Sequence, residues 1–156
     1  MTTDTTDTTT HATSGDELAD GPAGGPAEVQ ARELADVVRR LNPKVRSGAF
    51  VVVSLPSQSD VPVEAIIHED DAVTHVVARD IAKAEGWGYD FVAGWITLGV
   101  ETDLALVGLT AIVTTALAEH GISCNVLAGQ RHDHLLVPLD RLDDALLVLA
   151  RLSRDH

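Results

Sequence analysis

The spacing of hydrophobic and polar residues predicts a mixed chain of helices and strands. In the first half, apolar residues recur at helical spacing as far as Asn42-Pro43, where the proline disfavours helix in the residue before it. Shorter β-branched runs follow, which are typical of strands. The elements predicted there are a helix over 27–42, a strand over 49–55, a hairpin of 65–67 and 73–77, and a short helix over 79–85 closed by Gly86.

The second half shows the same alternation more clearly. Asp103 is placed to cap a helix, and Gly121 follows the end of that helix. Asp140 is placed to cap the last helix, whose apolar face carries Leu142, Ala145, Leu146 and Leu149. The predicted elements are a strand over 91–100, a helix over 103–119, strands over 122–128 and 132–137, and a final helix from 140.

This order of elements predicts an α+β fold of the ferredoxin-like type. The second half has the order of a split βαββαβ sandwich, but the chain reaches His156 without the fourth strand. An edge strand must therefore come from the first half or from a second copy of the chain. Segments 75–80 and 135–140 each open a helix after a hairpin, which indicates two repeats. Residues 55–65 are too short to hold a counterpart of the helix over 103–119, so the first repeat is predicted to be truncated.

The composition divides the chain into three segments. Residues 1–26 hold five acids, no base and almost no large apolar side chain, and they are predicted to be a disordered acidic tail. Residues 27–90 are predicted to be the truncated N-terminal unit with a leading helix, and residues 91–156 the complete C-terminal unit. One face of their combined sheet would carry no helices, and such a face usually meets a partner.

Charge and cysteine usage narrow the classes of function. With 24 acids and 11 bases the formal charge is −13, so nucleic acid and anionic membrane surfaces would be repelled. The single cysteine, Cys124, excludes an intramolecular disulfide and a cysteine-based zinc site, and a reducing cytoplasm is the expected compartment. No basic, apolar leader and no run of about 18 apolar residues is present, so neither classical export nor a membrane span is predicted.

The best candidate site is the loop 101–109, which we expect to face the segment 121–125. Backbone amides at the start of a helix bind carboxylates well. If alternate residues of 121–125 point to the core, Ser123 and Asn125 share the opposite face, where a hydroxyl and an amide could satisfy an amino group and a carboxylate together. The alternative is that Gly108 only permits close helix packing and that the two polar residues satisfy turn backbone.

A second candidate is the trio His132, Asp133 and His134. Histidines two apart on a strand share a face and are possible ligands of zinc or iron. No spacing argument brings a third ligand near them, so we interpret them first as surface or interface residues of a strand. Cys124 is expected to face the core, where burial silences a thiol as a nucleophile. Ser123 lacks the glycines of a Gly-x-Ser-x-Gly motif, and no phosphate-binding glycine motif occurs.

Four segments resemble ACT domain proteins, namely 89–98, 107–110, 121–129 and 132–138. The chain is similar to the small stand-alone group in which two ACT-like units lie in tandem. This resemblance implies an ACT-type ferredoxin-like sandwich, no cofactor, and a non-catalytic role in sensing amino acids or similar small molecules. In that family the effector lies at an interface between ACT units, against the first strand-helix loop and the following strand. Carried over, it implies the ligand-binding residues Leu106, Val107, Gly108, Leu109, Ser123 and Asn125.

The sequence therefore predicts a regulatory or sensor module that forms a homodimer through its sheet and binds an amino acid between units. Two alternatives stay open. One is a metal-dependent or acid-base enzyme centred on His132, Asp133 and His134, and the other is a protein-interaction module without a ligand.

Overall fold

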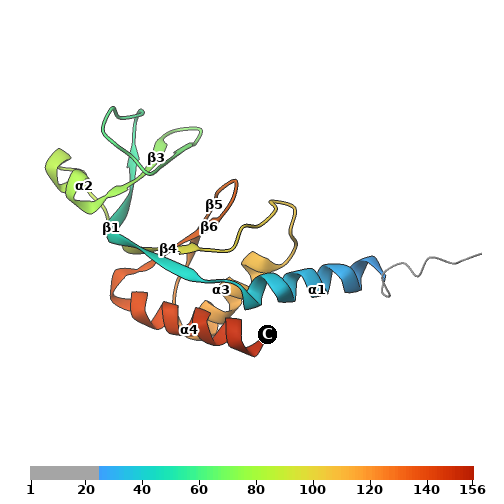
Figure 1. Cartoon of the computed structure of the whole chain (residues 1–156). Coiled ribbons are helices and arrows are strands. Elements are labelled where there is room, and N and C mark those ends of the chain that lie inside the picture. The colour runs from blue at the N-terminus through green and yellow to red at the C-terminus, as the bar shows by residue number, and fades with distance from the viewer. Residues whose placement is uncertain (1–24) are drawn as a thin grey trace, which may run out of the picture.

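One six-stranded antiparallel sheet carries the helices in the computed structural model, which describes residues 25–156 (Figure 1). The strand order is β2-β3-β1-β4-β6-β5. In chain order the elements are α1 (Pro26–Arg39), β1 (Pro43–Leu55), β2 (Ala65–His68), β3 (Val73–Ala78), α2 (Arg79–Glu85), β4 (Val92–Leu98), α3 (Leu109–Glu119), β5 (Asn125–Ala128), β6 (Asp133–Pro138), the 3-10 turn η1 (Leu139–Arg141) and α4 (Leu142–Asp155).

The fourth strand of the C-terminal sandwich comes from the first half of the same chain. β1 pairs with β4, so β1, β4, β6 and β5 stand in the order fourth, first, third, second of a βαββαβ sandwich. In return, β4 completes the sheet that begins with β1, β2 and β3. The first strand of each half therefore completes the sheet of the other half. Of the two predicted sources of the missing strand, the first half of the chain supplies it.

The two halves are related by an approximate two-fold axis between β1 and β4. Phe50 of β1 pairs with Ala93 of β4, while Ala78 flanks Phe50 and Pro138 flanks Ala93. Ala78 and Pro138 hold equivalent places in the two repeats predicted from the sequence, each just before a helical segment. The repeat is thus confirmed. Its truncation is also present, because a loop rather than a helix joins β1 to β2.

β1 is longer than the strand predicted from residue 49. Its first residues, Pro43 to Arg46, pair with Leu98 to Trp95 of β4. The register then shifts between Arg46 and Phe50. This part of the strand is polar and largely exposed, so no run of apolar residues announces it. The sheet partner β4 determines its conformation instead.

The main core lies where α1, α3 and α4 cover the C-terminal half of the sheet (Figure 1). Val38, Leu41 and Leu117 are fully buried there against Ile96 and Leu135. The leading helix α1 therefore packs on the helices of the C-terminal half. The division of the chain at residue 90 stays a prediction, and of the predicted tail only Gly25 and Pro26 lie within the described residues.

A smaller core lies beneath α2. Val51 and Val77 are fully buried there with Ala82. His75 is also fully buried, and its Nδ1 donates to the Val73 carbonyl at 3.0 Å while its Nε2 accepts the amide of Ser59 at 3.2 Å. The imidazole thereby holds the loop that replaces the missing helix.

The opposite face of the sheet carries no helix, as predicted; its largest side chains are buried, whereas Ile67 on the same face is 47% exposed. Phe50 and Trp95 contact each other with ring centroids 5.2 Å apart, and Trp95 is only 4% exposed. The Arg46 guanidinium lies 5.1 Å from the centre of the Trp95 ring. That this face meets a partner stays a prediction. Among the described residues, no helix has the length and apolarity needed to cross a membrane.

Candidate functional site

The loop between β4 and α3 differs from its prediction at the start of the helix. α3 begins at Leu109 with Gly108 as its N-cap, so the predicted cap at Asp103 is wrong. The Asp103 carboxylate instead accepts the amide of Ala105 at 2.9 Å and forms a turn inside the loop. Gly108 has φ +101°, a conformation that side chains rarely adopt, and an added Cβ would lie 2.8 Å from Cδ2 of Leu34 on α1. The loop therefore closes directly against α1.

This loop and the β5-β6 hairpin enclose a cavity of about 90 Å³, which we call the loop cavity. It is lined by Thr102, Asp103, Leu104, Leu106, Leu109, Thr110, Ala128 and Asp133. The Thr102 amide donates to the Arg131 carbonyl at 3.2 Å, and Arg131 forms an ion pair with Glu101. These contacts hold the loop against the hairpin.

The predicted site residues divide between the cavity and its surroundings. Leu106 and Leu109 line the loop cavity, whereas Val107 and Gly108 lie in the same loop without lining it, and Val107 is 62% exposed. Ser123 and Asn125 are exposed, alternating with Ile122 and Cys124, which pack on the core. They do not line the loop cavity. The predicted strand over 122–128 is shorter than expected, since β5 begins only at Asn125.

The polar groups at the loop cavity are complementary to a zwitterion. No side chain caps α3 and its first turn holds no acid, while the first amides of a helix lack intrahelical acceptors and carry the positive end of its dipole. Asp103 and Asp133 supply the two carboxylates of the cavity lining. A ligand carboxylate fits the helix start, and a ligand ammonium group fits the two aspartates.

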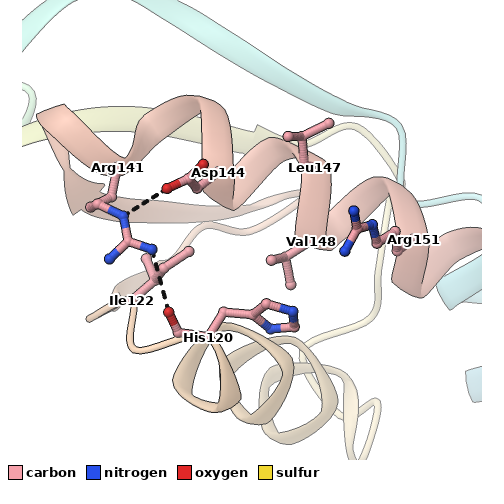
Figure 2. A pocket seen from close by; sticks show the side chains of 7 residues that line it. All are labelled: His120, Ile122, Arg141, Asp144, Leu147, Val148 and Arg151. Carbon is pink, nitrogen blue, oxygen red and sulfur yellow. Dashed lines mark hydrogen bonds and ion pairs between the residues drawn. The ribbon is translucent and has the colours of Figure 1, made fainter.

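A second cavity, of about 250 Å³, lies between the end of α3 and α4, and we call it the helix cavity (Figure 2). Its lining consists of His120, Ile122, Arg141, Asp144, Leu147, Val148 and Arg151. No pattern in the sequence predicts this cavity. These residues come from segments that are remote in the sequence and belong to no motif, so only the packing of α3 on α4 assembles them.

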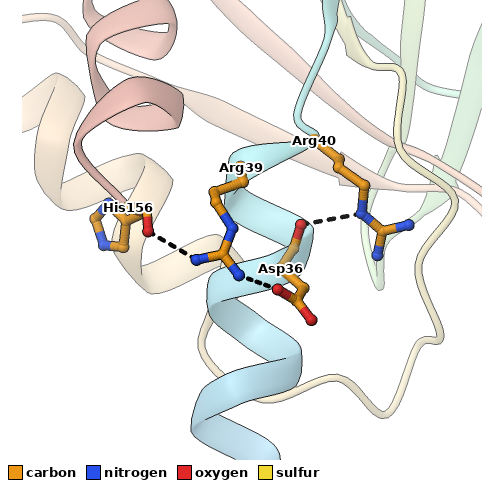
Figure 3. A network of polar contacts seen from close by, with 4 residues as sticks. All are labelled: Asp36, Arg39, Arg40 and His156. Carbon is orange, nitrogen blue, oxygen red and sulfur yellow. Dashed lines mark hydrogen bonds and ion pairs between the residues drawn. The ribbon is translucent and has the colours of Figure 1, made fainter.

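α1 is anchored to the end of α4 by a polar network (Figure 3). Arg39 donates from Nη1 to the His156 carbonyl at 2.9 Å and forms an ion pair with Asp36. Arg40 donates from Nε to the Asp36 carbonyl at 3.0 Å, and the Ser153 hydroxyl donates to the Arg39 carbonyl at 2.7 Å. This network holds α1, and with it Leu34, over Gly108.

His132, Asp133 and His134 do not form a metal centre. Residues 25–156 contain no cluster of three or more histidine, cysteine, aspartate or glutamate side chains placed to hold an ion. Nδ1 of His134 lies 3.0 Å from Oγ1 of Thr97, and its ring lies 5.3 Å from that of Trp95. Burial of the imidazole lowers the pKa of His134, with a further contribution from the charge of His132. Asp133 belongs to the loop cavity instead.

Cys124 is half-buried beside the main core. Burial raises the pKa of its thiol to about 11, because the thiolate loses solvation. The side chain is therefore placed to pack and not to act as a nucleophile at neutral pH.

Family models described as ACT domain match two consecutive parts of the chain. One covers residues 31–94 and the other residues 91–151. A search of curated proteins found no match.

Several solved structures share the fold. A Vibrio cholerae protein of unknown function, described as a possible transport protein, is 30% identical; the match covers 80% of this chain and 98% of that one, with a TM-score of 0.72. An Agrobacterium tumefaciens protein is 21% identical over 71% and 87% of the two chains, with a TM-score of 0.56. The regulatory subunit of aspartate kinase from Thermus flavus is 14% identical over 70% and 95%, with a TM-score of 0.52.

Proposed function

Since this chain belongs to the ACT domain family and holds two ACT units in tandem, we propose that it is a non-catalytic regulatory module whose effector is a small amino acid. The fold it shares with a regulatory subunit of aspartate kinase supports the regulatory role. The observation that carries the amino acid proposal is the loop cavity, whose lining combines the start of α3 with the carboxylates of Asp103 and Asp133.

The size and charge of the loop cavity favour a particular class of amino acid. About 90 Å³ equals the share of roughly three water molecules in the liquid, which leaves room for only the smallest amino acids. Glu101 lies beside the loop in an ion pair with Arg131, so its charge is already balanced. The two remaining carboxylates would repel a second acidic group. We therefore propose a neutral amino acid rather than aspartate or glutamate.

We propose that a second copy of the chain completes the effector site and transmits the signal. β5 is an edge strand of the sheet, so one row of its backbone groups pairs with no strand in residues 25–156. Asn125 is the first residue of β5, and Ser123 lies two residues before it. Both are exposed, so a second copy could contact them. The effector would shift the equilibrium between arrangements of the two copies, because it contacts the copies differently in each arrangement.

A thermal-shift screen of the twenty free amino acids tests this function. An effector present at about 100 times its Kd stabilises the folded chain by about 2.7 kcal/mol. We expect one or a few small neutral amino acids to raise the melting temperature, and uniform melting across the screen would contradict the proposal.

Two isosteric variants separate binding at the loop cavity from general effects of charge. Asp103→Asn keeps the side-chain oxygen that accepts the Ala105 amide but loses the charge, and we expect it to abolish the amino acid shift. Asp140→Asn is the matched control, because Asp140 is exposed and does not line the loop cavity. An equal loss in both variants would contradict the site.

The single cysteine agrees with a cytoplasmic location, which remains part of the proposal.

A further inference from the structure

The helix cavity gathers positive groups in a chain whose formal charge is −13. Arg141, Arg151 and His120 line it, with Asp144 as its single carboxylate (Figure 2). Its lining shares no residue with that of the loop cavity; α3 separates the two, since its first residues line one and the residue after its end lines the other. The helix cavity is therefore a separate place for a ligand.

Arg141 is held in position with donors to spare. Its Nε donates to Asp144 Oδ2 at 2.8 Å, and its Nη2 donates to the His120 carbonyl at 3.3 Å. That second bond covers a carbonyl at the negative end of α3, which would otherwise disfavour an anion. A guanidinium carries five N–H donors, so Arg141 retains donors for a ligand after both contacts.

Arg151 adds positive charge at the other end of the helix cavity, and His120 adds an imidazole. Arg151 is exposed and takes part in no ion pair within residues 25–156. Nδ1 of His120 donates to the Ala116 carbonyl at 2.9 Å, so the other ring nitrogen, Nε2, is the one that could contact a ligand. In Figure 2 the His120 ring lies below Val148, on the side of Arg151. Guanidinium groups bind carboxylates and phosphates with paired hydrogen bonds.

The floor of the helix cavity is apolar. Ile122 and Val148 are 3% and 6% exposed, while Leu147, at 59%, forms an open wall. A simple inorganic anion would leave these surfaces without contacts, whereas an organic anion with a hydrocarbon body would cover them. The volume of about 250 Å³ lies below the range for drug-sized ligands and suits a molecule of metabolite size.

We propose that the helix cavity binds a small organic carboxylate with an apolar body, with the carboxylate on the guanidinium of Arg151 and the hydrocarbon against Ile122, Leu147 and Val148, toward Arg141. This site is additional to the amino acid site and does not depend on it. It gives the regulatory module a second chemical input.

Calorimetric titration of the full chain at low ionic strength tests the proposal with three probes. 3-Phenylpropanoate has both the carboxylate and an apolar body, 3-phenylpropanamide lacks the charge, and inorganic phosphate lacks the body. We expect 3-phenylpropanoate to bind at least tenfold more tightly than either of the others, since a hydrogen bond to a charged group is worth about a factor of ten or more. Absence of binding, or equal binding of phosphate by adventitious attraction, would overturn the proposal.

Two arginines on α4 supply a matched pair of variants. Arg151→Gln should weaken binding of 3-phenylpropanoate about tenfold. Arg154→Gln removes the same charge from the same helix outside the cavity lining and should leave binding unchanged. Equal weakening in both would show general attraction and overturn the site. Because Arg151 is exposed, the Arg151→Gln chain should fold normally. Its melting temperature should still rise with the amino acid found in the thermal-shift screen. A missing rise in the unchanged chain would contradict the proposed function without affecting the test of the helix cavity.

Discussion

Replacing Gly108 with alanine tests how tightly α1 closes the loop beside the proposed effector site. Gly108 has φ +101°, well beyond the left-handed minimum near +57°, and this conformation costs an alanine about 1–2 kcal/mol. The new Cβ would also lie 2.8 Å from Cδ2 of Leu34, and moving that side chain off its rotamer costs about 0.5–1.5 kcal/mol. We therefore expect Gly108→Ala to lower the free energy of unfolding by about 2–3 kcal/mol.

Urea denaturation followed by circular dichroism measures this effect, with Gly121→Ala as the control. Gly121 has φ +65°, and no atom lies within 4 Å of the position of its added Cβ, so only the conformational cost of about 1 kcal/mol applies. Adding Leu34→Ala to Gly108→Ala should remove the clash and show a coupling of about 1 kcal/mol. If Gly108→Ala cost no more than Gly121→Ala, the contact between α1 and the loop would not be as described.

Three further predictions concern buried or half-buried groups. Because the pKa of His134 is lowered by the fold, the unfolded chain binds more protons below about pH 6.5; stability should fall as the pH drops from 7.5 to 5, and His134→Gln should reduce this slope in urea denaturation, whereas an unchanged slope would refute the assignment. Cys124, with a thiol pKa of about 11, should react with a disulfide reagent at pH 8 more than tenfold more slowly in the native than in the urea-unfolded chain, and comparable rates would contradict its burial. His75→Ala should cost about 2–4 kcal/mol in denaturation, because it opens a cavity and removes the partners of Val73 and Ser59; a cost below 1 kcal/mol would argue against the two hydrogen bonds.

The sequence predicted those elements whose pattern of burial is local. The hairpin arm predicted over 73–77 and the short helix predicted over 79–85 match β3 and α2 closely. The first residues of β1 were missed because Lys44 and Arg46 are exposed, so their strand conformation depends on pairing with β4. The start of α3 was placed too early because Asp103, a good N-cap by type, bonds inside its own loop.

For the candidate sites too, the sequence predicts the residues that lie close together along the chain and misses those that tertiary packing brings in. The loop after β4 could be identified from its place before a helix, whose first amides suit a carboxylate, and Leu106 and Leu109, which the family resemblance implies, line a cavity there. Ala128 and Asp133 complete that cavity through the β5-β6 hairpin, which no spacing rule connects to the loop. The helix cavity had no local signal, since Arg141 meets the end of α3 only through tertiary packing.

A crystal structure of the chain with the amino acid found in the screen tests the central claim most directly. The account predicts the ligand in the loop cavity, with its ammonium group about 3 Å from the carboxylates of Asp103 and Asp133 and its carboxylate on the first amides of α3. An empty loop cavity with the amino acid bound elsewhere on the chain would contradict it.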